Sequence, residues 1–249
     1  MIIRFLQILF FFIIASSKAM ATTVPSYSYS EMYMYDNQDD NNECDHNVSD
    51  DLIPDPFYII NKNIFNINLL IDNAFISPAT EIYIFVVPAP ARNRVGNFMS
   101  NLGEPINFFN LLLQGKFKQA NISLTRFTTN TVLGCLGVLD VASKVNLPYK
   151  GEDFGQTLAQ YKAPTGPYIV APILGPTSLR DLTGKVVDFF IDPFKYAMKR
   201  SERNAINVAW LLHKRAGAKN VIKTIKSSID PYETAKVLYI QNRVSLIND

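Results

Sequence analysis

Hydrophobic and polar residues alternate at helical spacing through most of the chain after residue 90. Apolar residues recur every three or four positions, which is the pattern of helices that have one apolar face. This periodicity predicts helices over residues 91–102, 105–114, 117–134, 178–191, 205–216 and 231–244. The chain is therefore expected to be mainly helical.

Start and stop residues support these boundaries. Gly103 is expected to end the first of these helices, and Pro105 to begin the next. Ser178 and Asp181 have the spacing of a capping box, in which Asp181 reaches back to the helix start. Asp230 followed by Pro231 is typical of the first turn of a helix.

Three segments have unusual patterns. Residues 61–71 suit a strand as well as a helix, because asparagines and apolar residues alternate there. Glycines and prolines are dense over 134–175, which indicates either a long surface loop or a functional one. Within it, the apolar run 168–174 either faces lipid or lines a constriction. Residues 106–113 are apolar except at two asparagines, so this short helix lies either in a core or in the plane of a membrane.

The helix at 117–134 has a more ordinary pattern. Phe117, Ala120, Leu124 and Phe127 form an apolar stripe that is expected to be its buried face. Arg126 lies off this stripe and is expected to face solvent.

The N-terminal part differs in composition from the body. Residues 1–21 have the charged start, short apolar run and Ala-x-Ala ending of a secretory signal, and the apolar run is too short to span a bilayer. Residues 22–53 form an acidic leader, expected to be disordered. A single folded domain is expected over 54–249.

The charge of the body favours a membrane surface as a partner. The whole chain carries a net charge of +2, but from Asp55 onward there are 22 basic and 14 acidic residues. A basic body suits anionic lipids. Nucleic acid is not an expected partner, because the basic residues are scattered and do not cluster with aromatic residues.

The residues that usually carry chemistry are sparse. His46 and His213 have no partner at catalytic or metal-binding spacing, and neither a paired-histidine motif nor Gly-x-Ser-x-Gly occurs. The adjacent acids Glu152 and Asp153 are interpreted as a salt bridge or loop cap rather than a catalytic pair. The sequence predicts no enzyme, metal or cofactor. Of the two cysteines, Cys44 and Cys135, the second is expected to be free and buried in an apolar run.

Four phrases in the middle of the chain carry a family resemblance. They are NFMSNLGEPINFFNLLLQG at 97–115, RFTTNTVLG at 126–134, EDFGQTL at 152–158 and GPYIVAPILGPTSLRD at 166–181. Together and in this order they resemble the MlaA (VacJ) family. That resemblance implies an all-α fold, in which amphipathic helices form a ring in one membrane leaflet around an amphipathic passage.

The resemblance also implies a function and partners. Proteins of this family remove mislocalised phospholipids from the outer leaflet of the Gram-negative outer membrane and pass them to a periplasmic lipid carrier protein. They dock beside outer-membrane porin trimers and lie on the periplasmic side. The chain departs from the family in two places: Thr22 stands where a lipoprotein has its acylated cysteine, and the DPLEGFNR phrase is only partly kept after Asp55.

Within this framework, apolar residues beside the shared phrases are candidates for lipid contact. They are Phe108, Phe109, Tyr168, Ile169, Val170, Phe189 and Phe190. Arg180 either steers the phosphate of a headgroup or is a structural partner of Asp181 or of a carbonyl. The alternatives to transport are a secreted or surface-associated binding protein that keeps the fold, and a lipid-cleaving enzyme.

Overall fold

The computed structural model describes residues 53–248, and the signal segment, the leader up to residue 52 and Cys44 lie outside them. The elements in chain order are α2 (Tyr58–Ile71), the π-helix η2 (Asp72–Ile76), α3 (Ser77–Val86), α4 (Ala89–Leu113), α5 (Phe117–Val132), α6 (Val141–Lys144), α7 (Phe154–Gln160), β1 (Tyr168–Ala171), β2 (Gly175–Ser178), α8 (Leu179–Ile191), α9 (Pro193–Ala197), α10 (Arg200–Gly217), α11 (Lys219–Ser227) and α12 (Pro231–Asn248). The predicted all-α class is confirmed, and one antiparallel hairpin of β1 and β2 is added within the described part.

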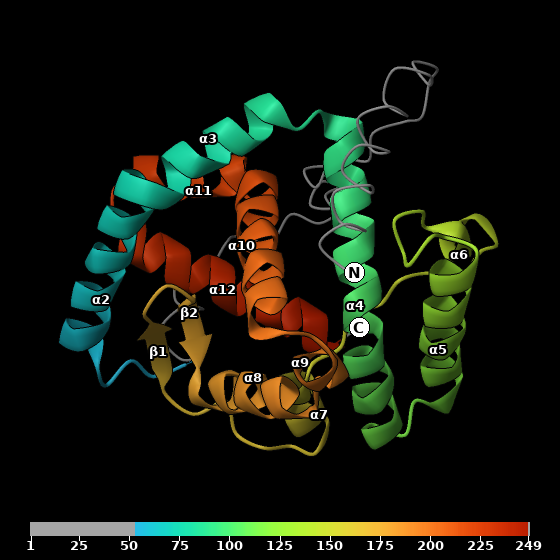
Figure 1. Cartoon of the computed structure of the whole chain (residues 1–249). Coiled ribbons are helices and arrows are strands. Elements are labelled where there is room, and N and C mark those ends of the chain that lie inside the picture. The colour runs from blue at the N-terminus through green and yellow to red at the C-terminus, as the bar shows by residue number, and fades with distance from the viewer. Residues whose placement is uncertain (1–52, 249) are drawn as a thin grey trace, which may run out of the picture.

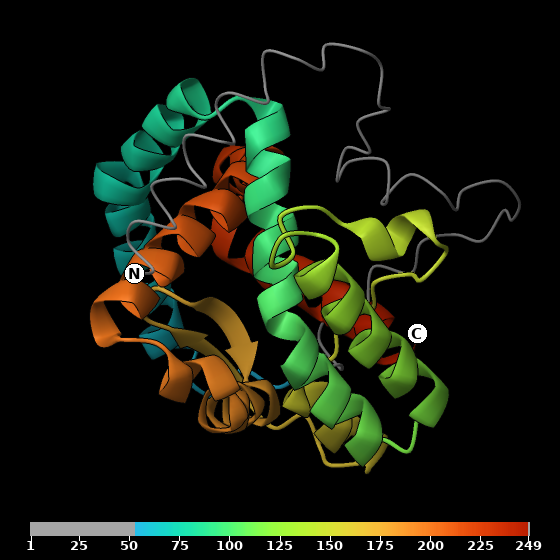
Figure 2. The same cartoon turned by 45° about the vertical axis from the view of Figure 1, so that its right-hand side comes forward.

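The helices form a ring. In Figure 1, α2 and α3 curve along one side, α4 closes the other side, and α8 lies across the bottom, while α10 runs inside this outline. Figure 2 shows α5 lying alongside the outer side of α4, with α6 beyond it. This arrangement agrees with the ring that the resemblance implies.

The hydrophobic core lies at one side of the ring, between α2, β1 and α12. Phe65, Tyr168, Val170, Tyr232 and Ile240 are buried together there. The rings of Phe65 and Tyr168 meet the ring of Tyr232 edge-on, at centroid distances of 5.6 and 6.1 Å. Tyr168 and Val170 are therefore core residues, and their prediction as lipid contacts is corrected.

Asparagines of α2 explain why residues 61–71 are helical. Asn61 and Asn68 are seven residues apart, so they lie on the same helix face, two turns from each other. The amide of Asn61 donates to the Tyr168 carbonyl at 3.0 Å and accepts from the Val170 N–H at 2.9 Å. Asn68 donates to the Ala171 carbonyl at 3.0 Å. The helix thus satisfies the open edge of β1, which would otherwise carry unpaired backbone groups.

Helix α4 runs through the two residues that were expected to interrupt it. Pro105 is inside the helix, and Gly103 precedes it without a break. Proline removes the hydrogen bond to residue 101 and normally kinks or ends a helix. Here Glu104 before the proline and Asn107 after it are both buried, so contacts on either side keep the two halves together. The separate helices predicted at 91–102 and 105–114 are one helix.

The segment 134–175 is more ordered than a loop. It contains α6, α7 and β1, and Asp153 caps α7 by accepting from the Gln156 N–H at 2.9 Å. Cys135 has a left-handed backbone, with φ of 53°, in the turn that follows α5. That turn directs its side chain outward, so Cys135 is exposed and the prediction of a buried cysteine is wrong.

The C-terminal helices agree with the predictions, with some changes. Helix α8 begins where Ser178 accepts from the Asp181 N–H at 3.2 Å, and Asp230 caps α12 by accepting from the Tyr232 N–H at 2.9 Å. The carboxylate of Asp181 does not complete the capping box, because it pairs with Arg243. Helix α10 starts five residues earlier than predicted, and α11 was not predicted.

Asp72 joins the outer arc, which is the continuous helical segment Tyr58–Val86 formed by α2, η2 and α3, to helices α10 and α11. It lies in η2 and binds the Arg215 guanidinium at 2.7 Å and the Lys226 ammonium at 2.6 Å. Burial by itself would raise the pKa of Asp72, but the hydrogen bonds and charges of these two cations outweigh it and lower the pKa to about 2. One carboxylate therefore ties α10 and α11 to the arc.

The ion pairs of Asp72 predict a pH-dependent contribution to the stability of the fold. A carboxylate whose pKa is lower in the folded state stabilises the protein above its unfolded pKa, near 4, and loses that effect as the pH falls toward 2. We expect Asp72→Asn to lower the free energy of unfolding by about 2 kcal/mol at pH 7, with the difference from the native chain shrinking below pH 4. Urea denaturation across this pH range measures it. A difference that stays constant down to pH 2 contradicts the assignment.

Candidate functional site

The second half of α4 buries mainly polar side chains and exposes mainly apolar ones, with Leu111 as a buried exception. Its buried side chains include Glu104, Asn107 and Asn110, each at most 5% exposed. Phe109 is 45% exposed, and Leu113 is exposed beside it. This is the reverse of a helix in a water-soluble protein, whose apolar face turns inward. The predicted apolar helix at 106–113 thus turns part of its apolar side chains out of the molecule.

Helix α5 has the same inverted pattern. Its buried side chains are Ala120, Ser123, Arg126 and Asn130. Of the predicted buried stripe only Ala120 is buried, whereas Phe117 and Leu124 are exposed, and Val132 is 77% exposed. The prediction that Arg126 faces solvent is therefore wrong. The helix buries its polar side because α4 presents matching polar groups to it.

A buried ion pair joins α4 and α5. The Arg126 Nε lies 2.8 Å from the Glu104 Oε1, and both side chains are almost fully buried. Arg126 also binds Asp140 at 3.2 Å, and the Ser123 hydroxyl donates to the Glu104 Oε2 at 2.7 Å. Burial would raise the pKa of Asp140, but hydrogen bonds from Ser143 and the Arg126 charge lower it below its ordinary value.

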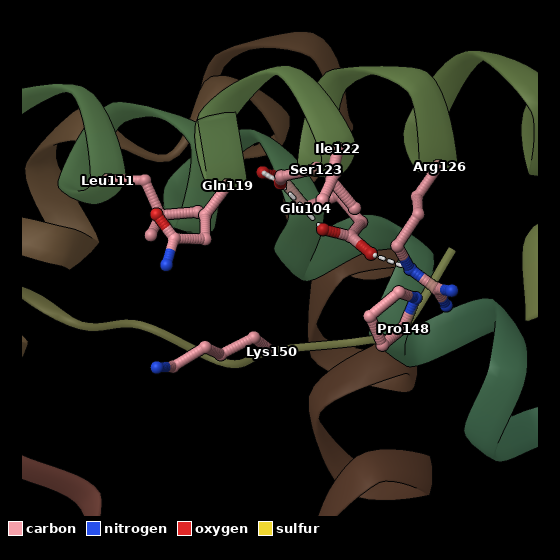
Figure 3. Close-up of a pocket in the computed structure, with 8 residues that line it drawn as sticks. All are labelled: Glu104, Leu111, Gln119, Ile122, Ser123, Arg126, Pro148 and Lys150. Carbon is pink, nitrogen blue, oxygen red and sulfur yellow. Dashed lines mark hydrogen bonds and ion pairs between the residues drawn. The ribbon is translucent and has the colours of Figure 1, made fainter. Parts of the chain in front are cut away.

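A cavity of about 240 Å³ lies beside this pair. Figure 3 shows Glu104 and Arg126 facing one another at its wall. Its charged lining residues are all paired, since Lys150 also lies 3.8 Å from Glu152. The cavity therefore offers no free charge to a ligand. Its lining residues are Glu104, Leu111, Gln119, Ile122, Ser123, Arg126, Pro148 and Lys150.

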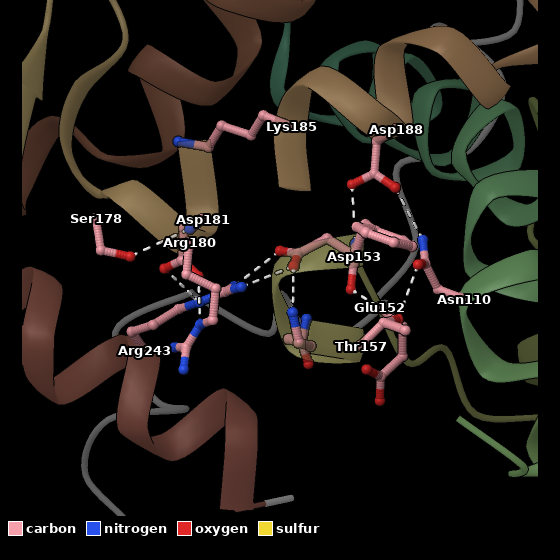
Figure 4. A network of polar contacts seen from close by, with 12 residues as sticks. Asn110, Glu152, Asp153, Thr157, Ser178, Arg180, Asp181, Lys185, Asp188 and Arg243 are labelled. Carbon is pink, nitrogen blue, oxygen red and sulfur yellow. Dashed lines mark hydrogen bonds and ion pairs between the residues drawn. The ribbon is translucent and has the colours of Figure 1, made fainter. Parts of the chain in front are cut away.

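A second polar network connects α7, α8 and α12, as Figure 4 shows. Arg243 binds Asp153 through two hydrogen bonds of 2.7 and 2.8 Å, and its Nε lies 2.7 Å from Asp181. The Tyr239 hydroxyl donates to Asp181 at 2.5 Å. Burial by itself would raise the pKa of Asp153, but the hydrogen bonds and charge of Arg243 lower it. Paired charges of this kind position helices rather than perform proton transfer.

Arg180 belongs to this network. Its Nε lies 3.4 Å from Asp181, its Nη1 donates to the Ala163 carbonyl at 3.3 Å, and its side chain is buried. Of the two roles predicted for Arg180, the structure agrees with the structural one. The interpretation of the adjacent acids as a salt bridge and a cap is also confirmed, since Glu152 lies 3.3 Å from Lys116 and Asp153 caps α7.

Two lysines, one on α8 and one on α10, have no carboxylate partner in the described chain. Lys185 of α8 is directed away from the ion-pair network in Figure 4, and its Nζ lies 3.4 Å from the Thr177 hydroxyl. The Lys214 Nζ lies 4.6 Å from the centre of the Trp210 ring. Within residues 53–248, neither ammonium forms a salt bridge.

The charges of these two lysines interact. Burial lowers the pKa of Lys185, and burial together with the positive charge of Lys185 lowers the pKa of Lys214. The sequence analysis missed both lysines as site residues.

The other predicted lipid contacts lie on the surface. Phe109, Phe189 and Phe190 are exposed, and Phe108 and Ile169 are half-buried. The outer arc is also apolar and exposed. Its continuous helical segment Tyr58–Val86 has a mean hydropathy of 1.3 over its most apolar window, of which 6% is buried, and by length and composition it could cross a membrane.

Comparison with known proteins decides the family. The sequence profile of the MlaA lipoprotein family matches residues 53–246, which is most of the chain. The chain belongs to the MlaA lipoprotein family. A solved MlaA-family structure, described under "Structural basis for maintenance of bacterial outer membrane lipid asymmetry", has a TM-score of 0.69 and 32% sequence identity, and it covers 78% of this chain and 99% of the other.

Relatives of known sequence agree with this membership. Uncharacterized protein RC0123 of Rickettsia conorii is 31% identical, over 83% of this chain and 80% of its own. The intermembrane phospholipid transport system lipoprotein MlaA of Haemophilus influenzae is 34% identical, over 74% and 75%. The Escherichia coli protein of the same name is 37% identical, over 55% and 56%. The named MlaA proteins are lipoproteins of an intermembrane phospholipid transport system, and membership of the family implies a membrane-associated place in the Gram-negative envelope.

Proposed function

We propose that this protein is the outer-membrane component of intermembrane phospholipid transport. It removes mislocalised phospholipids from the outer leaflet and passes them to a periplasmic lipid carrier protein, which maintains lipid asymmetry. The observation that carries the proposal is the inverted amphipathicity of α4 and α5, together with two exposed lysines on α8 and α10 that form no salt bridge in the described chain. The named relatives support it.

The apolar exterior supports a position within one leaflet. Acyl chains would contact the exposed apolar residues of the outer arc, of α4 and α5, and of the C-terminal end of α8. Each square ångström of apolar surface that leaves water contributes about 25 cal/mol. The segment Tyr58–Val86 has the length to cross a bilayer, but in Figure 1 it curves along the ring, with η2 between its halves. A curved apolar helix of this kind suits the plane of the membrane.

The two exposed lysines support a path for headgroups. A phospholipid that leaves the leaflet must keep its phosphate in a polar place and its chains against apolar surface. Lys185 and Lys214 supply positive charge without a competing carboxylate, so they are the residues that we assign to the phosphate. Arg180 is not assigned to the phosphate, because its guanidinium already binds Asp181 and the Ala163 carbonyl.

Two further partners are part of this proposal. We propose that the ring docks beside an outer-membrane porin trimer and delivers lipid to the carrier on the periplasmic side. The carrier would receive lipid from a passive conduit, and the energy for directed transport would come from another component of the system.

The test replaces Lys185 and Lys214 in a host that lacks its own MlaA. The native chain is expected to reach the outer membrane and to lower outer-leaflet phospholipid. The double variant Lys185→Glu, Lys214→Glu is expected to reach the membrane in the same amount and to leave outer-leaflet phospholipid close to the level of the empty host. Carboxylates at these places repel the phosphate. Lys144→Glu, on the exposed surface of α6, is the matched control and is expected to behave as the native chain.

Three results would count against the proposal. If the double variant lowers outer-leaflet phospholipid as well as the native chain does, the two lysines do not contact the headgroup. Recovery of the native chain in the soluble fraction, with no change in outer-leaflet phospholipid, favours a binding protein that keeps the fold without transport. Hydrolysis of labelled phospholipid by the purified chain favours an enzyme.

A further inference from the structure

A half-buried lysine is held among three aromatic rings where α8 meets α9. The Lys195 Nζ lies 3.9 Å from the ring centre of Phe189, 4.2 Å from that of Phe190 and 5.3 Å from that of Tyr196. The Tyr196 hydroxyl donates to the Phe190 carbonyl at 3.0 Å, which fixes that ring in place. We call these four residues the aromatic corner.

The aromatic corner leaves its charge without an acceptor. Aromatic faces attract an ammonium but do not accept strong hydrogen bonds from it. No carboxylate of the described chain forms a salt bridge with Lys195. The acids nearest in sequence are engaged elsewhere, since Asp192 accepts from the Phe194 N–H at 2.9 Å, and Glu202 is buried and accepts from the Lys199 N–H at 3.3 Å.

Further positive charge follows directly. Lys199 and Arg200 are exposed at the start of α10, and the two form no salt bridge within residues 53–248. Arg203 donates to the Lys195 carbonyl at 2.7 Å, which ties α10 to the corner. The surface therefore combines exposed aromatic rings with a group of uncompensated cations.

That combination matches the boundary between acyl chains and headgroups. Aromatic rings are enriched at this depth, and lysines extend their charged ends from it toward water. A phosphate group would supply the acceptor that the Lys195 ammonium lacks, while the rings would contact the first methylenes of the chains. Lys226, by contrast, has its charge neutralised by Asp72.

We propose that the aromatic corner, with Lys199 and Arg200, is a binding site for the phosphate of anionic phospholipids at the membrane surface. The site lies on the exterior of the ring and is separate from Lys185 and Lys214. It relies on the membrane position in the proposed function, but it does not require transport. Its chemistry selects lipids with net negative charge over zwitterionic lipids, because each basic residue near an anionic surface adds to binding.

The test measures binding of the purified full chain to vesicles of phosphatidylcholine alone and of phosphatidylcholine with phosphatidylglycerol. Lys195→Gln is expected to lower the partition coefficient on the anionic vesicles roughly fivefold and to leave binding to the neutral vesicles unchanged. Lys195→Arg, which keeps the charge over the rings, is expected to bind as the native chain does. Lys144→Gln, the matched lysine on α6, is expected to have at most a small effect.

Other outcomes overturn the inference. Equal losses in Lys195→Gln and Lys144→Gln indicate a general charge effect without a site. Loss in Lys195→Arg as well as in Lys195→Gln indicates a packing role for the lysine. Inorganic phosphate that competes more strongly than chloride at the same ionic strength indicates a site for free phosphate. The vesicle assay measures binding and not transport. Its result therefore decides the lipid-binding site separately from the proposed transport function.

Discussion

Arg126→Ala is expected to lower the free energy of unfolding by about 3–5 kcal/mol, which is the usual cost of breaking a buried ion pair from one side. The substitution removes the partner of Glu104 at 2.8 Å and leaves that carboxylate buried with only neutral donors. It also removes the bond to Asp140 that holds the segment after α5. Urea denaturation in detergent, followed by fluorescence of the only tryptophan, measures the change.

Two variants show whether charge burial is the cause. Glu104→Gln combined with Arg126→Met removes both charges and is expected to recover part of the lost stability, because no unpaired charge remains. Lys118→Ala, on the exposed side of the same helix, is expected to change the free energy of unfolding by less than about 0.5 kcal/mol. A double variant that is less stable than Arg126→Ala contradicts this account.

Gly184→Ala is expected to destabilise the protein by about 3 kcal/mol, at the upper end of the usual cost of overpacking. A Cβ atom at this position would lie 2.3 Å from the backbone nitrogen of Gly155 and 2.8 Å from its Cα. Backbone cannot move aside as a flexible side chain does, so α7 and α8 would have to separate. Asp153 and Asp181 stand at the starts of these two helices, and their shared partner Arg243 would lose one of them.

Gly103→Ala is the matched control for this prediction. Gly103 is also inside a helix, but a Cβ atom there would meet nothing within 4 Å. Alanine is expected to raise the free energy of unfolding by about 0.5–1 kcal/mol, since glycine is a poorer helix former. Thermal unfolding of the two variants in the same detergent compares them. Equal effects of the two alanines would show that the contact between α7 and α8 is not tight.

Much of the fold could be predicted from local pattern. The helices around 117–134, 178–191 and 231–244 have periodic apolar positions, and the last two also have capping residues. These signals act within a few residues of the chain, and the structure contains all three helices. The order of the four shared phrases indicated the family, which the comparison confirms. The strand or helix choice at 61–71 stayed open, because it depends on the asparagine contacts with β1, a segment about 100 residues away.

The candidate site was less accessible from the sequence. Phe109, Phe189 and Phe190 could be named because apolar aromatic residues are conspicuous, and they are exposed. Tyr168 and Val170 were chosen because they lie in the apolar run 168–174, but they belong to the core, where Tyr232 and Phe65 meet them. Lys185 and Lys214 could not be found from spacing, because the absence of a nearby carboxylate depends on the positions of other helices.

By itself, the sequence determined where most helices lie, which face of each is apolar, and the family. Only the tertiary structure decided which face is turned inward. Periodicity is the same for a helix in water and for a helix against lipid, so the stripe of Phe117 and Leu124 was expected inside, and Arg126 outside. The structure reverses them because Glu104 provides a buried partner for Arg126, and an ion pair satisfied inside the protein frees the apolar face for the exterior.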